Sequence, residues 1–178
     1  GDGAWTVFAS ARAGRAVDEA PAVDELAAAR QRCTRAAPPD RLYDALRAAG
    51  LELGPAFRSV EQVAHGPGEA MGRVRLGESV ATETGMFLHP ALLDGCFQLA
   101  FAAAGDLDAA EPPFLVPAGI GRMVSFAPAT AGVWAHVTTR PGASPGSMLA
   151  DLIVWDDAGR RLAVVESLRL VRGRADRL

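Results

Sequence analysis

One segment, residues 87–105 (FLHPALLDGCFQLAFAAAG), constrains the fold most strongly, because it is apolar almost throughout. Pro90 suits the first turn of a helix, where a missing N–H costs nothing, and Gly105 can end that helix. A helix that is apolar on all sides belongs inside a protein core. We therefore predict one buried helix between these two residues.

Two polar side chains interrupt this segment, Asp94 and Gln98, four residues apart. That spacing places them on one face of a helix, where both are buried or line a cavity. Two interpretations follow: they are a satisfied pair that holds the helix in register, or Asp94 is a general acid that Gln98 orients on the wall of an apolar tunnel. Burial would raise the pKa of Asp94 and the nearby helix N-terminus would lower it, and the spacing leaves the balance open.

The rest of the chain predicts a sheet around this helix. A second helix is expected at 40–49, with Asp40 as its N-cap and Gly50 at its end. A strand-like run at 5–11 has no evident partner, so we expect a piece of a longer protein, followed by a charged linker with a short helix at 23–32. Further strands are expected at 58–65, 69–76, 115–126, 133–140, 148–155 and 161–171. The predicted fold class is α+β, an antiparallel sheet wrapped around one buried central helix.

Composition narrows the possible functions. With 22% charged residues and a net charge of −3, the chain has no basic footprint for nucleic acid or for an anionic membrane. It contains no glycine-rich phosphate loop and no apolar run suited to a bilayer, and we expect no signal peptide. The cysteines, Cys33 and Cys96, lack metal-binding spacing. These features predict a cytoplasmic protein without nucleic-acid or membrane partners.

Several stretches resemble the dehydratase domains of modular and iterative polyketide synthases. LHPALLDGCFQ, at 88–98, resembles their second catalytic motif, H-P-A-L-L-D-x-x-x-Q/H. GLELGPAF, at 50–57, is similar to their G-Y-x-Y-G-P-x-F motif and lies at the expected distance upstream. FLVPAGIGRM and LADLIVWDDAGRRLAVVESLRLVR resemble the closing strands of the family, and WTVFASARAG resembles the last strand of its first half.

This resemblance implies half of a double hotdog fold, in which two sheets each wrap a central helix. Residues 1–39 would be the last strand of a preceding hotdog plus a linker, and 40–178 the C-terminal hotdog. Asp94 would be the acid that protonates the departing hydroxyl of a 3-hydroxyacyl thioester, and Gln98 would orient it. The base would be a histidine of an H-x-x-x-G-x-x-x-x-P motif on the N-terminal hotdog, from the same polypeptide or another chain.

The resemblance also implies partners and a substrate site. The substrate would be carried on the phosphopantetheine of an acyl carrier protein, within a homodimeric megasynthase, and the reaction would need no metal and no dissociable cofactor. The expected substrate-binding residues are Leu53, Gly54, Pro55, Phe57, His89, Pro90 and Pro117.

The chain departs from the family pattern in two ways. None of its three histidines begins the base motif: we interpret His89 as orienting the turn before the helix, His65 as an exposed turn residue and His136 as a structural residue on a strand. Leu51 and Leu53 stand where the family has tyrosines. Two alternatives stay open, namely a non-catalytic module that supports the megasynthase or its dimer, and a related isomerase or cyclase. A free-standing hotdog thioesterase is possible from the fold alone, but the wording of the motifs argues against it.

Overall fold

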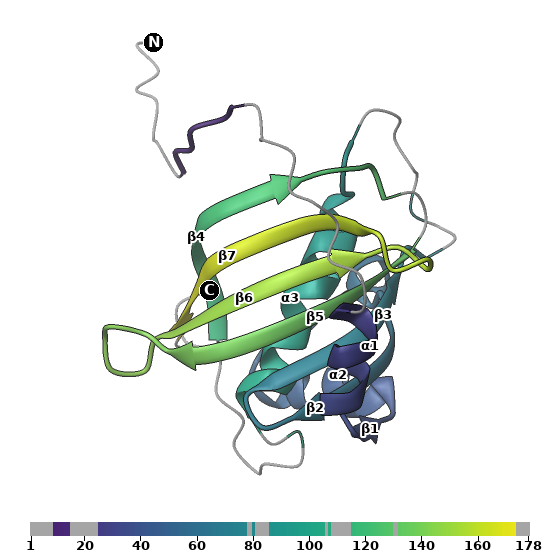
Figure 1. Cartoon of the computed structure of the whole chain (residues 1–178). Coiled ribbons are helices and arrows are strands. Elements are labelled where there is room, and N and C mark those ends of the chain that lie inside the picture. Colours follow the sequence, from purple (N-terminus) through teal and green to yellow (C-terminus); the bar gives the residue numbers. More distant parts are fainter. Residues whose placement is uncertain are drawn as a thin grey trace.

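A computed structural model of the chain describes residues 9–14, 25–77, 80, 86–105, 107, 115–129 and 132–173. Its strands form one antiparallel sheet of seven, in the order β1-β2-β3-β5-β6-β7-β4, which curves around helix α3 (Figure 1). The helices are α1 (Glu25–Arg32), α2 (Pro39–Ala48), the 3₁₀ turn η1 (Pro55–Phe57) and α3 (Pro90–Ala104). The strands are β1 (Arg35–Ala37), β2 (Val60–Gly66), β3 (Glu69–Arg75), β4 (Leu115–Ser125), β5 (Gly132–Pro141), β6 (Met148–Trp155) and β7 (Arg161–Arg172).

The predicted α+β fold, a sheet around one central helix, is confirmed. Each of the six strands expected after residue 57 is present, with ends shifted by at most two residues, and the short helix expected at 23–32 is α1. Strand β1 was not predicted; it pairs with β2, so the sheet includes residues that the predicted division placed in the linker. The strand expected at 5–11 lies mostly outside the described residues, and 9–11 have no regular secondary structure.

Two other local predictions are wrong. Asp40 is not the N-cap of α2: Pro38 holds that position, and Pro39 begins the helix because its ring presets a helical φ. The Asp40 carboxylate instead accepts a hydrogen bond from Arg58 Nη2 at 3.2 Å. His65 is not an exposed turn residue, because β2 continues to Gly66 and the His65 side chain is buried. Gly50 does follow α2, with a φ of 95° that favours glycine.

Helix α3 lies close against the sheet and carries the middle of the core. Leu92, Cys96 and Leu99 on this helix are fully buried. Two glycines permit the close approach: a Cβ at Gly95 would collide with Ser59 Oγ of the β2 entry and with Val74 of β3, and a Cβ at Gly72 would collide with Leu99. A larger residue at Gly95 or Gly72 would therefore push α3 away from the sheet.

We expect Gly95→Ala to destabilise the chain by about 1–3 kcal/mol, the usual cost of overpacking a core. The gain in helix propensity from alanine is about 1 kcal/mol at most and does not offset the collision with Ser59 and Val74. Chemical denaturation measures the difference. Gly77→Ala is the control, because its Cβ would meet nothing within 4 Å, and an equal loss of stability in both variants would contradict the packing argument.

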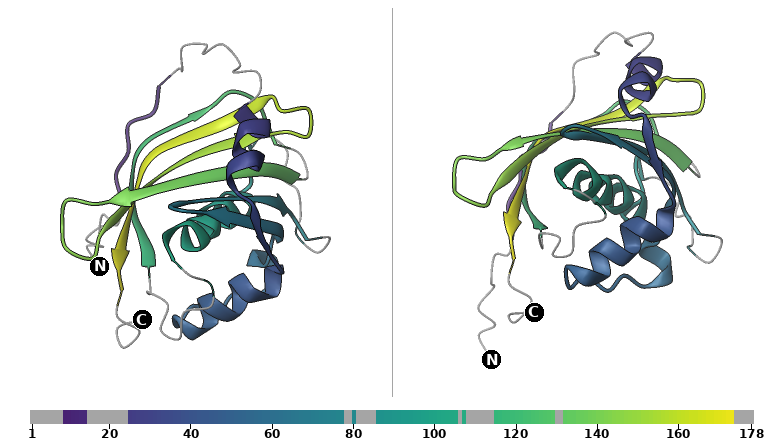
Figure 2. Two further views of the ribbon diagram at one scale, coloured as in Figure 1. Left: turned by 60° about the horizontal axis from the view of Figure 1, so that its bottom comes forward. Right: turned by 90° about the horizontal axis from the view of Figure 1, so that it is seen from below.

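Helix α1 covers the opposite face of the sheet from α3 (Figure 2). A second, smaller apolar cluster holds it there, formed by Leu26, Ala29 and Cys33 from the helix region with Met71 of β3 and Trp155 of β6. No helix within the described part of the chain is long and apolar enough to cross a membrane.

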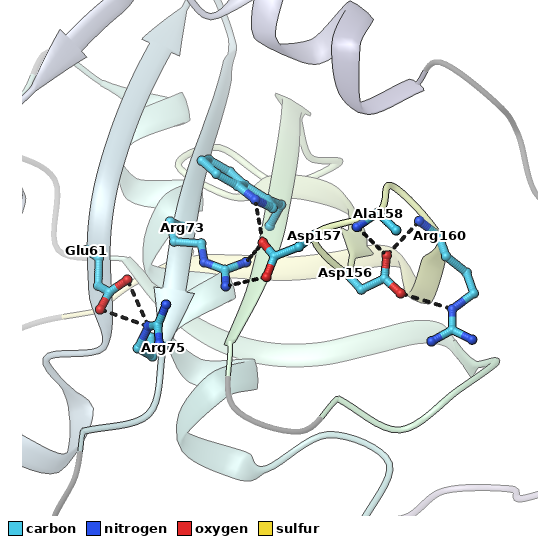
Figure 3. A network of polar contacts seen from close by, with 8 residues as sticks. Glu61, Arg73, Arg75, Asp156, Asp157, Ala158 and Arg160 are labelled. Carbon is cyan, nitrogen blue, oxygen red and sulfur yellow. Dashed lines mark hydrogen bonds and ion pairs between the residues drawn. The ribbon is translucent and has the colours of Figure 1, made fainter.

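A polar network ties β3 to the turn between β6 and β7 (Figure 3). Arg73 of β3 is buried, and its guanidinium forms an ion pair with Asp157 at 2.6 Å. Asp157 also accepts a hydrogen bond from Trp134 Nε1 at 3.2 Å. The adjacent Asp156 accepts the backbone N–H groups of Ala158 and Arg160, which closes the turn. Pairing is what makes burial of the Arg73 charge tolerable.

Candidate active site

Asp94 and Gln98 point toward one another from successive turns of α3. The amide Nε2 of Gln98 donates a hydrogen bond to Asp94 Oδ2 at 2.7 Å. It donates a second hydrogen bond to the backbone carbonyl of Phe57 at 2.8 Å. Both amide hydrogens are thus used, and Gln98, only 7% exposed, links the carboxyl group to the chain at η1. This contact fixes the Gln98 amide, which in turn positions the Asp94 carboxyl.

Burial raises the pKa of the Asp94 carboxyl above its ordinary value, and the hydrogen bond from Gln98 lowers it only in part. Desolvation therefore penalises the carboxylate more than the Gln98 donor stabilises it, which shifts the equilibrium toward the protonated form. A buried carboxyl group with a raised pKa keeps its proton to higher pH than a free one, which suits a general acid.

The Asp94 carboxyl faces an apolar cavity of about 90 Å³, here called the Asp94 cavity. Its polar side chains are those of Asp94 and Gln98, so the described chain offers no cluster of metal ligands there. The remaining lining residues are Leu46, Leu51, Leu53, Phe97, Ala100, Phe101, Leu115, Val116, Pro117 and Leu170.

The segments 50–57 and 88–98, which resemble the two family motifs, meet at this cavity. Of the expected substrate-binding residues, Leu53 and Pro117 line it. Gly54 is the N-cap of η1 and Pro55 its first residue, and Phe57, which is 44% exposed, offers its backbone carbonyl to Gln98. His89 and Pro90 lie at the start of α3 instead.

His89 is the N-cap of α3. Its Nδ1 accepts a hydrogen bond from the backbone N–H of Ala91 at 3.1 Å, so the side chain satisfies one of the free donors at the helix start. This is the orienting role expected from the sequence. None of the three histidines lines the Asp94 cavity in the described residues.

Comparison with known proteins identifies the family. The sequence profile of the polyketide synthase dehydratase N-terminal domain matches residues 21–178, which is most of the chain. The chain belongs to the polyketide synthase dehydratase family.

Related proteins agree with this membership. The chain is 32% identical over 145 residues to the highly reducing polyketide synthase dmxL2 of Cryptosporiopsis sp., covering 77% of this chain and 6% of that protein. It is 33% identical over 132 residues to the phthioceranic/hydroxyphthioceranic acid synthase of Mycobacterium tuberculosis, covering 72% of this chain and 6% of that protein. The chain therefore spans only a small part of these synthases.

Solved dehydratase structures share its fold. The dehydratase domain from the CurK module of the curacin polyketide synthase superposes with a TM-score of 0.77 at 26% identity, covering 91% of this chain and 56% of that one. GphF dehydratase 1 superposes with a TM-score of 0.66 at 34% identity, covering 79% of this chain and 51% of that one. The chain spans just over half the length of these dehydratases.

The sequence alone missed part of the Asp94 cavity. Phe97 and Phe101 follow Asp94 at helical spacing and share its face, so the pattern that placed Gln98 could have placed them too. Leu115, Val116 and Leu170 come from β4 and β7, far away in the sequence, and no local signal connects them to Asp94.

Proposed function

We propose that this chain is the C-terminal hotdog of a polyketide synthase dehydratase domain, with Asp94 as the catalytic acid. The substrate is a 3-hydroxyacyl thioester carried by the phosphopantetheine of an acyl carrier protein, and the product is an α,β-unsaturated thioester. One observation carries this proposal: a carboxyl group with a raised pKa, fixed by Gln98, faces an apolar cavity.

In the proposed reaction, a base removes the α-proton and that electron pair forms the new C=C bond. The C–O bond at the third carbon breaks as Asp94 transfers its proton to the departing oxygen, which leaves as water. Asp94 ends as a carboxylate, stabilised by the Gln98 N–H, and regains a proton before the next turnover. Hydroxide is a poor leaving group, so this protonation is essential, and the apolar walls favour the protonated form of the acid.

The base in this proposal is a histidine on the N-terminal hotdog, from the same polypeptide or from another chain. The sequence of this chain contains no H-x-x-x-G-x-x-x-x-P motif. Two solved CurK dehydratases are described as inactive mutants, one with a histidine replaced by phenylalanine and one with an aspartate replaced by asparagine. These descriptions support a two-residue mechanism of which the present chain carries the aspartate.

Strand β4 offers the N-terminal hotdog a contact surface in this proposal. Among the described residues it is an edge of the sheet, paired with β7 alone, and much of it is exposed. Ile120 and Met123 on this strand are 44% and 37% exposed. Exposed apolar side chains on an edge strand suit burial against another unit, such as the first hotdog of the same domain within a dimeric synthase.

A reconstitution experiment tests the function. The complete dehydratase domain and the 178-residue chain are each given a 3-hydroxyacyl carrier-protein thioester, and the unsaturated product is followed by mass spectrometry. We expect dehydration by the complete domain and none by the chain alone, because acid and base must act on one substrate. Equal turnover by the chain alone would overturn the assignment of the base to the other hotdog.

A non-catalytic supporting module is the second candidate, because Leu51 and Leu53 give the Asp94 cavity two apolar walls where the family has tyrosine hydroxyls. In that case the complete, folded domain would fail to dehydrate any 3-hydroxyacyl thioester offered. Restoring the hydroxyls with Leu51→Tyr and Leu53→Tyr would then test whether their loss accounts for the inactivity.

A further inference from the structure

Three chemically active side chains meet on the face of the sheet opposite the Asp94 cavity. These are Cys33, Glu69 and His136, and their sulfur, carboxylate and ring-nitrogen atoms all lie within 4.8 Å of one another. Glu69 Oε2 and His136 Nε2 are 2.7 Å apart. Proposed dehydration at Asp94 uses none of the three.

Each of the three residues belongs to a different part of the fold. Cys33 directly follows α1, and its backbone N–H donates to the carbonyl of Ala29 at 3.0 Å. His136 of β5 lies opposite Met71 of β3, so Glu69, two residues before Met71, shares the same face of the sheet. The apolar cluster under α1 includes both Cys33 and Met71, which keeps the helix end above this part of the sheet.

The surroundings hold the carboxylate and the imidazole in place. The side chains of His136 and Glu69 are 6% and 13% exposed. The guanidinium of Arg32 donates from Nε to both oxygens of Glu69, at 3.2 and 3.0 Å, which orients the carboxylate. Such support of a ligand by a neighbouring hydrogen-bonding group is typical of metal sites.

We propose that Cys33, Glu69 and His136 form a binding site for a transition-metal ion of the Zn²⁺ type, which links α1 to strands β3 and β5. Sulfur, nitrogen and oxygen ligands together suit Zn²⁺, and the thiolate and the carboxylate bring two negative charges to the ion, of which the carboxylate charge also pairs with Arg32. Three protein ligands leave one coordination position for water. The expected effect is structural: the ion fastens the segment before β1 to the sheet.

Metal entry is feasible from solvent on either side of this group. A cavity of about 450 Å³ is lined in part by Cys33, Met71 and Trp134. Another, of about 290 Å³, is lined in part by Arg32 and His136. Burial and the nearby Glu69 carboxylate raise the pKa of Cys33 to about 11, so binding displaces the thiol proton as it does at other thiolate sites.

Titration with Co²⁺ alone tests the site directly. The full chain, freed of metal by a chelator, is titrated while its near-ultraviolet absorption is recorded. We expect a thiolate-to-cobalt charge-transfer band, its loss when Zn²⁺ displaces Co²⁺, and a higher Tm in the presence of Zn²⁺ because the ion binds the folded chain more tightly than the unfolded one. A chain that develops no such band and shows no rise in Tm would overturn the proposal.

Variants identify the ligands. Cys33→Ser should abolish the band. Loss of a group that only supports a ligand weakens metal binding by about 10–100-fold, and His136→Gln should weaken it by more, because it removes a ligand. Cys96→Ala is the matched control, because Cys96 is the other buried cysteine and lies inside α3. Circular dichroism confirms that each variant is folded. A band that persists in Cys33→Ser, or that disappears in Cys96→Ala, would contradict this ligand set.

Discussion

Replacement of Asp94 by asparagine in the complete dehydratase domain is expected to lower kcat by about 10²–10⁴-fold, the contribution of a positioned general acid. Asparagine keeps the shape of the side chain and an oxygen that can accept the hydrogen bond from Gln98. It has no acidic proton to transfer to the departing hydroxyl. Single-turnover measurement with a 3-hydroxyacyl carrier-protein thioester gives the rate.

The fold should survive this substitution, because burial already favours the uncharged form of Asp94. Thermal unfolding verifies this, and Glu52→Gln serves as the matched control, since it removes an exposed carboxylate from the loop that precedes η1. Turnover by Asp94→Asn equal to that of Glu52→Gln would remove Asp94 from the mechanism. The interpretation of Asp94 and Gln98 as a purely structural pair would then remain.

Replacement of Gln98 by leucine is expected to lower kcat by about 10²-fold, because small displacements of a reacting group have costs of this size. The variant also leaves the carbonyl of Phe57 without the donor that Gln98 supplies, which costs about 1–3 kcal/mol of stability for a buried acceptor. We therefore describe Gln98 as a positioning residue, and a fall in rate alone would not separate its role in orientation from its role in folding.

The pH dependence of kcat separates these roles. The hydrogen bond from Gln98 lowers the pKa of Asp94, so its removal raises that pKa further and keeps the acid protonated to higher pH. The fall of kcat with rising pH should accordingly occur at higher pH in Gln98→Leu. A purely structural defect would instead lower kcat by the same factor at every pH. Gln98→His, the residue that the family uses as the alternative, should recover most of the rate. A profile that does not move would contradict the positioning role.

Local patterns were sufficient for much of the fold. The apolar run at 87–105 predicted α3, because a helix without a polar face is stable only when other elements surround it. Alternation and turn residues predicted strands β2 to β7, since each signal lies within the strand and its flanking turns. The three-residue strand β1 was missed because it is defined by its partner β2 and has no pattern of its own.

At the candidate active site, the sequence determined which side chains share a helix face, and the tertiary structure determined what surrounds them. Helical periodicity placed Asp94 beside Gln98. The second hydrogen bond of the Gln98 amide, to the carbonyl of Phe57, joins segments that meet only in the folded chain. The raised pKa of Asp94 also depends on the fold, because burial raises it more than the hydrogen bond from Gln98 lowers it.

The Cys33–Glu69–His136 group on the opposite face of the sheet could not be predicted from the sequence. Sequence spacing gave no metal motif, because Cys33, Glu69 and His136 are separated by tens of residues. Their meeting depends on the register of β3 against β5 and on the packing of α1 over Met71 and Trp155. The sequence alone determined the buried helix and its acid–amide pair, which are local properties of one periodic segment. The cavity, the raised pKa of Asp94 and the Cys33–Glu69–His136 group depend on the folded chain, because each arises from contacts between distant segments.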